Sequence, residues 1–147
     1  MKVLVTGPDG FVGRKVCERL LADEIDVCGA RREISPLADV CESAIVGDIN
    51  GSTDWSNALT GIDVVVHLAA RVHIMDDTAA DPMAAFREVN VGGTGRLAEE
   101  AAKSGVKRFV FISSIKVNGE ATLRSRDRRP DDGSQSSEVS SERRKTK

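Results

Sequence analysis

The sequence predicts an α/β fold, a doubly wound parallel sheet of about five strands with helices on both faces. Two observations predict it. Short apolar runs alternate with segments of helical periodicity over the first 114 residues, and several runs lack the polar alternation of a half-exposed strand. In addition, Gly7, Gly10 and Gly13 separate the first apolar run from the first helical segment.

Four strands are expected before the longest helix. They are "KVLVT" at 2–6, "DVCGA" at 26–30, "SAIVG" at 43–47 and "DVVVHLAA" at 63–70. A helix follows the first strand, because apolar side chains from Phe11 to Leu21 recur close to helical spacing. Shorter helices are expected after the second and third strands, which gives the alternating order of a parallel sheet.

The clearest helix begins after Asp81. This residue is expected as the N-cap, with Pro82 at the first helical position and Gly105 at the C-terminal cap. Its apolar stripe comprises Met83, Phe86, Val89, Gly93, Leu97 and Ala101. A fifth strand, "RFVFISS" at 108–114, leaves the sheet incomplete on its C-terminal side. Because an exposed apolar edge invites pairing, we expect self-association through this strand.

The composition of the chain changes near Gly119. Residues 120–147 contain eight Lys and Arg, six Asp and Glu, six Ser and only three apolar residues. Such a segment buries too little apolar surface to offset the entropy of ordering it. We therefore expect one folded domain over 1–119 and a disordered polar tail over 120–147, whose composition also suits an out-of-frame end.

Charge and composition exclude several classes of protein. The net charge of −2 gives no reason to expect nucleic acid or a membrane surface as a partner. No stretch predicts a signal peptide or a membrane span, so a cytoplasmic protein is expected. The three cysteines include no Cys-x-x-Cys pair, which favours buried thiols at Cys17 and Cys28 over disulfides or zinc. His67 and His73 are too isolated to suggest a metal site.

The three glycines indicate a phosphate-binding turn. A helix N-terminus presents unpaired N–H groups and a partial positive charge, and a turn without side chains lets a pyrophosphate reach them. Gly7 would make the tight turn, Gly10 would allow the phosphate to approach, and Gly13 would let the helix lie close to the strand. A glycine-rich turn without a ligand is the alternative. The strand before the glycines and the helix after them favour a dinucleotide.

Five motifs occur in order along the chain. They are "TGPDGFVG" at 6–13, "GDI" at 47–49, "VVHLAA" at 65–70, "VNVGGT" at 89–94 and "VFISSIKVNGE" at 110–120. Together they resemble the extended short-chain dehydrogenase/reductase family, and more narrowly its NAD-dependent epimerase/dehydratase branch, the nucleotide-sugar enzymes of the UDP-glucose 4-epimerase type. The resemblance implies a Rossmann domain that binds NAD or NADP. Members of this family are longer and carry a C-terminal substrate domain that binds the nucleotide sugar, so a truncated chain is expected.

The resemblance implies cofactor-binding roles for two groups of residues. The pyrophosphate loop, which binds through backbone N–H groups, would comprise Gly7, Gly10, Phe11, Val12 and Gly13. The end of the fourth strand, where small residues let the cofactor lie across the sheet edge, would comprise Leu68, Ala69 and Ala70. An ordinary core strand is the alternative for this second group.

Three further positions match the family. Asp48 and Ile49 match the pair that contacts adenine, the carboxylate by accepting from the exocyclic amine and the isoleucine by packing on the ring. A turn aspartate beside a core isoleucine is the alternative. Asn90 lies on the apolar stripe of the long helix, where a buried amide needs a partner. That partner is either the cofactor or a structural hydrogen bond.

The second strand departs from the pattern for NAD. Family members that prefer NAD end this strand with an acidic residue that takes the ribose hydroxyls, whereas Arg31 and Arg32 occur here. A guanidinium cannot accept a hydrogen bond from a hydroxyl, but it pairs with the 2′-phosphate of NADP. The two residues therefore favour NADP slightly. Two solvated arginines after a strand end are the alternative.

The catalytic residues of the family are incomplete in this chain. Ser114 matches the serine that orients the substrate hydroxyl. The family reaction also needs a tyrosine as general acid/base and a lysine four residues later, but the chain contains no tyrosine. We therefore expect the cofactor-binding half of a nucleotide-sugar epimerase, dehydratase or reductase, inactive as it stands. A non-catalytic dinucleotide-binding or interaction module is the second hypothesis.

Overall fold

The computed structural model describes residues 1–34, 41–72 and 81–114 of the 147-residue chain. Contacts divide the chain into two units, Met1–Ile112 and Ser113–Lys147. Every described helix and strand belongs to the first unit. The predicted tail and the predicted domain boundary at residue 119 lie outside the described residues.

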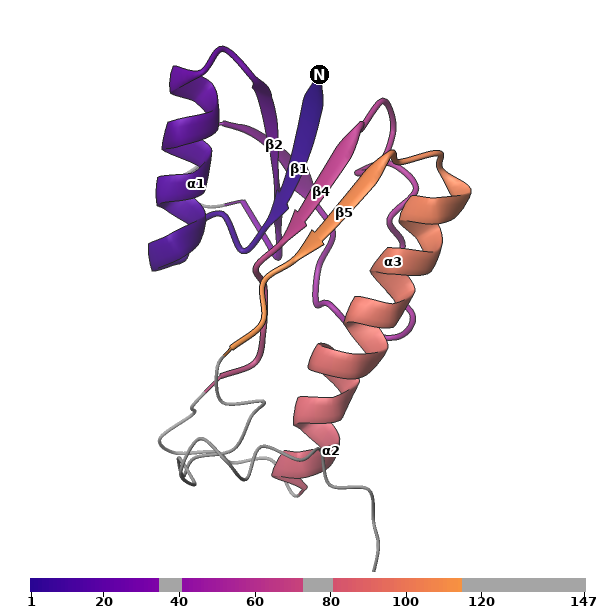
Figure 1. Cartoon of the computed structure of the whole chain (residues 1–147). Helices are drawn as coiled ribbons and strands as arrows, with labels where there is room; N and C mark the ends of the chain where they lie inside the picture. The colour runs from indigo at the N-terminus through magenta and orange to yellow at the C-terminus, as the bar shows by residue number, and fades with distance from the viewer. Residues whose placement is uncertain (35–40, 73–80, 115–147) are drawn as a thin grey trace, which may run out of the picture. The chain divides into compact units, whose positions relative to one another are not determined.

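Five parallel strands form one sheet in the order β3-β2-β1-β4-β5 (Figure 1). They are β1 (Lys2–Thr6), β2 (Asp26–Arg31), β3 (Glu42–Ile45), β4 (Val64–His67) and β5 (Arg108–Phe111). The chain builds outward from β1 on one side and returns to build on the other side with β4. This order confirms the predicted doubly wound fold, and it places the topological switch point between β1 and β4.

Helices cover both faces of the sheet. The helix α1 (Phe11–Ala22) lies on one face, and α3 (Thr94–Lys103) lies on the other (Figure 1). The apolar layer under α1 comprises Val3, Val5, Cys17 and Val27. The layer under α3 includes Leu4, Cys28, Val65, Leu97 and Ala101. Successive strand residues thus feed opposite layers, as expected for a sheet covered on both sides.

Two predicted thiols are buried as expected. Cys17 and Cys28 are 1% and 5% exposed. Burial raises the pKa of the Cys17 thiol to about 12 and raises that of Cys28 above its usual 9.0. Both side chains therefore act as small apolar groups of the core.

The segment between β3 and β4 forms turns where a helix was expected. Its apolar side chains are nevertheless buried in the layer under α3: Trp55, Ala58, Leu59 and Ile62. The expected helix between β2 and β3 falls partly on residues 35–40, which lie outside the described part of the chain.

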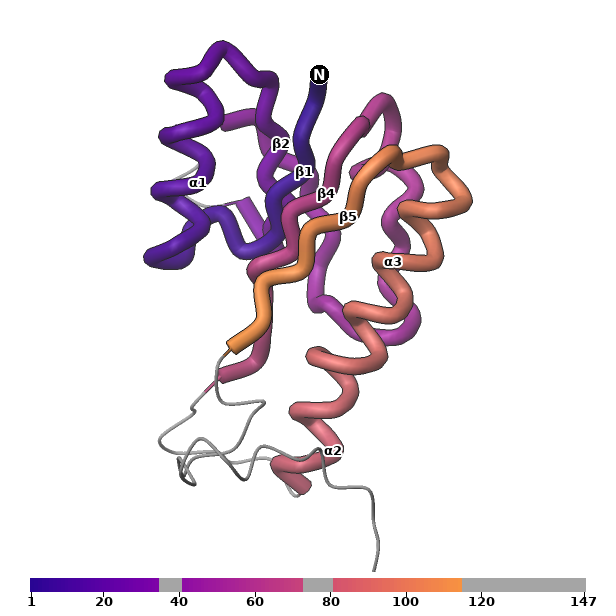
Figure 2. The backbone as a smooth tube through the Cα atoms, in the orientation of Figure 1, coloured from indigo at the N-terminus to yellow at the C-terminus, as the bar shows by residue number. Residues whose placement is uncertain are grey.

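A π-helical turn interrupts the long helix. The helix α2 (Pro82–Arg87) begins as predicted at Asp81, whose carboxylate accepts a first-turn backbone N–H at 3.0 Å. The π-helix η2 (Glu88–Gly93) then joins α2 to α3, so the three follow one another as one column (Figure 2). Gly105 follows α3 with a positive φ of 77°, as expected for a C-terminal cap. The predicted stripe fails at Met83, which is 61% exposed.

The strand β5 forms one edge of the described sheet. Among the described strands it pairs with β4 alone, and it is shorter than the predicted segment 108–114. Phe111 at its end is 53% exposed. An apolar edge is therefore available, and self-association through it stays a prediction.

A buried hydrogen-bond network ties the carboxyl ends of β1 and β4 together. The Thr6 hydroxyl lies 2.7 Å from Nδ1 of His67 and accepts the backbone N–H groups of Leu68 and Ala69 at 3.1 and 3.0 Å. Because these two N–H groups occupy the lone pairs of the Thr6 oxygen, its O–H donates to Nδ1. Nε2 of His67 then carries the proton and donates to the Thr94 hydroxyl at 2.9 Å. The network fixes the path of the chain as it leaves β4.

The glycine turn should tolerate no side chain at Gly13. A Cβ there would lie 2.0 Å from the carbonyl oxygen of Gly7, so α1 would have to move off the turn. We expect Gly13→Ala to lower the free energy of unfolding by about 1–3 kcal/mol, measured by chemical denaturation. Gly95→Ala is the matched control, because beyond its chain neighbours and the helix's own backbone no atom lies within 4 Å of the added Cβ in α3. Alanine should stabilise that helix by about 0.5–1 kcal/mol, and equal destabilisation of both variants would contradict the packing described.

His67 should make the stability of the fold depend on pH. Burial lowers the pKa of His67 from 6.5 to about 4. Below pH 6.5 the unfolded chain therefore takes up a proton that the folded chain does not. The contribution of His67 to the free energy of unfolding should be complete above pH 6.5. On acidification toward pH 4, the free energy of unfolding should fall by about 1.4 kcal/mol per pH unit. Chemical denaturation at a series of pH values measures this slope.

The matched variant is His67→Gln, which cannot titrate and should lose the slope. Asp54 and Asp63 do not interfere in this range. Their pKa values are lowered from 3.8, chiefly by the backbone N–H of Ser56 and the ammonium of Lys107 respectively. The stability they contribute is lost only below pH 3.8. An identical slope in the variant and the natural chain would exclude His67 as the cause.

Candidate functional site

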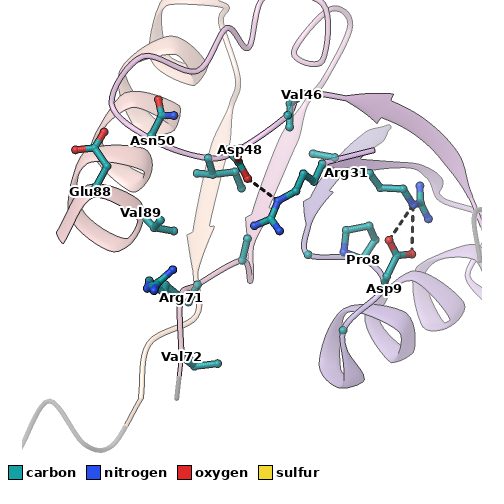
Figure 3. A pocket seen from close by; sticks show the side chains of 18 of the residues that line it. Pro8, Asp9, Arg31, Val46, Asp48, Asn50, Arg71, Val72, Glu88 and Val89 are labelled. Carbon is teal, nitrogen blue, oxygen red and sulfur yellow. Dashed lines mark hydrogen bonds and ion pairs between the residues drawn. The ribbon is translucent and has the colours of Figure 1, made fainter. Parts of the chain in front are cut away.

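The carboxyl ends of the strands open into a cavity of about 690 Å³. Its walls are the glycine turn after β1, the end of β2, the loop after β3, the end of β4 and the side of α2 and η2 that faces them (Figure 3). Pockets for small ligands usually measure about 300–1,000 Å³ and lie at such a switch point in doubly wound sheets. Eight of the predicted site residues line it: Gly7, Gly10, Arg31, Arg32, Asp48, Ile49, Ala69 and Ala70.

The other predicted residues are not among the lining residues: Phe11, Val12, Gly13, Leu68, Asn90 and Ser114. The side chains of Phe11 and Val12 extend into solvent from the first turn of α1, with 92% and 53% exposed. Leu68 packs into the layer under α1. Ser114 belongs to the second unit, and its catalytic role stays a prediction.

The glycine turn leaves the N-terminus of α1 without a side-chain cap. Gly7 has a positive φ of 66°, and a Cβ there would lie 3.2 Å from the backbone of Ala69. Gly10 is the N-cap of α1 and, having no side chain, makes no cap hydrogen bond to the first-turn N–H groups. These N–H groups have no partner within the helix, so they can bind an anion from the cavity.

The loop after β3 is held against the π-helix. A Cβ at Gly93 would lie 2.5 Å from Cγ2 of Ile49, so glycine allows η2 to pack on this loop. The carboxylate of Glu88 accepts the backbone N–H of Gly51 at 3.2 Å. The exposed Asp48 pairs with Nε of Arg32 at 2.6 Å. Half-buried Ile49 and exposed Asp48 thus present an apolar and a polar group side by side.

The two arginines after β2 lie in different environments. The side chain of Arg31 is only 2% exposed, and its Nε donates to both carboxylate oxygens of Asp9 at 3.2 Å. Its Nη1 donates to the hydroxyl of Ser43 at 2.6 Å. The side chain of Arg32 is 76% exposed and is paired with Asp48. The alternative of two solvated arginines therefore fails for Arg31, because its guanidinium is engaged inside the protein.

Asn90 forms the structural hydrogen bonds that were one of its two alternatives. Its Oδ1 accepts the backbone N–H of Arg71 at 2.8 Å, and its Nδ2 donates to the carbonyl of Arg71 at 2.9 Å. The guanidinium of Arg71 lies 5.6 Å from the ring centroid of Phe86. Asn90 therefore holds the backbone of Arg71, which follows β4 and lines the cavity, against η2.

Sequence reasoning missed charged residues of the cavity, namely Asp9, Arg71 and Glu88. Asp9 lies inside the glycine motif and Arg71 directly follows "HLAA", so their positions beside these motifs could have indicated that they line the site. Over 1–34, 41–72 and 81–114, no three His, Cys, Asp or Glu side chains cluster as metal ligands. No helix within these ranges is long and apolar enough to cross a membrane.

Known proteins similar to this chain include an epimerase and dinucleotide-binding proteins of solved structure. A UDP-glucose 4-epimerase of Vibrio cholerae is 49% identical over 123 residues, which are 82% of this chain and 37% of the relative. A short-chain dehydrogenase/reductase superfamily protein of Agrobacterium tumefaciens, solved with bound NAD, is 32% identical with a TM-score of 0.65 over 81% of this chain and 34% of its own. MoeE5, solved with UDP-glucose and NAD, is 30% identical with a TM-score of 0.67 over 82% of this chain and 39% of its own.

The chain thus spans little more than a third of the length of these relatives. Residues 3–139, far more than half of the chain, match the NAD dependent epimerase/dehydratase family. This match confirms the resemblance predicted from the five motifs, and the strand order and the glycine turn agree with it. The chain belongs to the NAD dependent epimerase/dehydratase family.

Proposed function

We propose that this chain binds NAD or NADP across the carboxyl ends of β1 and β4, as the cofactor-binding half of a nucleotide-sugar epimerase, dehydratase or reductase. A contrast between the glycines carries the proposal. The fold itself requires Gly7 for its positive φ and Gly13 for its contact with α1. It does not require Gly10, where a Cβ would meet only the oxygen of Gly7 at 3.4 Å. Close approach of a phosphate to the uncapped helix N-terminus explains a glycine at this position.

The cavity offers groups suited to each part of a dinucleotide. First-turn N–H groups of α1 would bind the pyrophosphate. Asp48 and Ile49 would hold the adenine, by a hydrogen bond from its amine and by packing on the ring. The small residues Ala69 and Ala70 would leave room for the nicotinamide half beside β4. The bound nicotinamide would supply hydride transfer, and the chain's own groups would bind and orient it.

The substrate is proposed from the relatives alone. The Vibrio cholerae relative is a UDP-glucose 4-epimerase, and MoeE5 was solved with UDP-glucose. A nucleotide sugar is therefore the proposed substrate of the complete catalytic unit. Ser114 is proposed to orient its reacting hydroxyl.

The missing tyrosine favours a second candidate function. None of the 147 residues is a tyrosine, so the chain has no phenol to take the proton of a sugar hydroxyl as hydride leaves. We expect no turnover from this chain alone, and a non-catalytic dinucleotide-binding or interaction module is the alternative. Self-association through the edge of β5 belongs to the same proposal, because the edge is apolar and exposed at Phe111.

Calorimetric titration of the full chain with NAD and with NADP tests the proposed function. We expect weak binding of at least one of them, because the groups for pyrophosphate and adenine are present. Gly10→Val should abolish binding by placing a side chain where the phosphate lies, while the midpoint of thermal unfolding changes little.

Gly95→Ala serves as the control, because that residue lies in open space on α3 and its variant should bind as the natural chain does. The proposed function fails if millimolar dinucleotide gives neither heat nor a thermal shift. It also fails if Gly10→Val binds as tightly as the natural chain.

A further inference from the structure

We propose that Asp9, in the glycine turn, supplies the carboxylate that the end of β2 lacks. It accepts a hydrogen bond from a hydroxyl of the adenosine ribose and makes the chain prefer NAD to NADP, with Arg31 as its positioning residue. The inference rests on the proposed function and specifies it further. It opposes the slight preference for NADP that the sequence pattern gives.

The structure brings the carboxylate of Asp9 to the end of β2. Both of its oxygens lie 3.2 Å from Nε of Arg31, the last residue of that strand (Figure 3). The Asp9 side chain is 34% exposed, and it lines the cavity together with Ala30 and Arg32. A turn residue thus places an acidic group beside the strand end, where dinucleotide-binding folds hold the ribose.

Arg31 is held too firmly to serve as a phosphate ligand. Its guanidinium bonds to Ser43 on β3 at 2.6 Å as well as to Asp9. The Arg31 side chain folds back over its own strand, as shown by its Nη1, which would lie 2.7 Å from a Cβ added at Gly29. The side chain is only 2% exposed, and a swing into the cavity would break these bonds and leave the Asp9 carboxylate without its cation. The guanidinium therefore orients Asp9.

The Asp9 carboxylate retains the capacity to accept further hydrogen bonds. Two carboxylate oxygens offer about four acceptor sites, and Nε of Arg31 donates a single N–H that the two oxygens share. Ribose hydroxyls are donors and suit the remaining sites. A 2′-phosphate is an anion with acceptor oxygens only, so it meets repulsion from the carboxylate and donates nothing to it.

Arg32 is a second cation at this end of the cavity, and it is already paired. Its Nε lies 2.6 Å from the Asp48 carboxylate. The negative charge of Asp48 offsets the positive charge that Arg32 would present to a 2′-phosphate, and it lies beside the ligand itself. The charges around the ribose therefore favour a hydroxyl over a phosphate.

Calorimetry with ADP-ribose and 2′-phospho-ADP-ribose tests the assignment on the full chain. These probes differ only in the phosphate at issue and lack the nicotinamide. We expect the natural chain to bind ADP-ribose at least about tenfold more tightly. Asp9→Asn keeps the shape but removes the charge, so it should reduce that ratio by about tenfold.

Asp23→Asn is the matched control. It also breaks an ion pair with an arginine, Arg19 at 2.9 Å, but on the exposed far end of α1 and outside the cavity lining. Its binding ratio should equal that of the natural chain. Asp9→Glu keeps the negative charge and should keep the preference for ADP-ribose, which decides the matter if Asp9→Asn does not fold.

Each outcome supports or overturns the assignment. Equal or tighter binding of 2′-phospho-ADP-ribose by the natural chain overturns it while the proposed dinucleotide site stands. An unchanged ratio in Asp9→Asn, or a lost preference in Asp9→Glu, also overturns it alone. Binding of neither probe by the natural chain overturns the assignment together with the proposed function.

Discussion

The first turn of α1 packs directly on the backbone of the glycine turn, and the rest of the structure depends on that contact. No side chain fits between Gly13 and the carbonyl of Gly7. This close packing sets the direction in which α1 leaves β1, so the helix N-terminus opens at the carboxyl ends of the strands. The same turn rests on the backbone of Ala69 at the end of β4. One short motif thereby places the helix, the switch point and the cavity.

Buried polar contacts then fix the remaining walls of the cavity. The network from Thr6 through His67 holds β4 against β1, and the amide of Asn90 clamps the chain beyond β4 onto η2. Arg31 ties the glycine turn to β3 through Asp9 and Ser43. These groups satisfy one another inside the protein, as buried polar groups must. The helix N-terminus and the Asp9 carboxylate are the groups that we propose to recognise a ligand.

The fold could be predicted because its signals are local. The apolar runs mark the strands, and Asp81 caps its helix through a neighbouring N–H. The turns between β3 and β4 could not be predicted, because Trp55, Ala58, Leu59 and Ile62 have the spacing of a helix face. Likewise, nothing in the order of residues marks the π-helix. The environment of Arg31 depends on partners 22 and 12 residues away, so its burial is invisible to local patterns.

We propose that the cavity at the switch point binds the diphosphate of a dinucleotide at the N-terminus of α1. The most direct test is a titration of the ¹⁵N-labelled chain with ADP-ribose, followed by NMR. We expect the largest shifts on the amides of residues 10–13, smaller shifts at 48–49 and 69–71, and none at the far end of α3. Shifts spread elsewhere, with the amides of residues 10–13 unchanged, would contradict it.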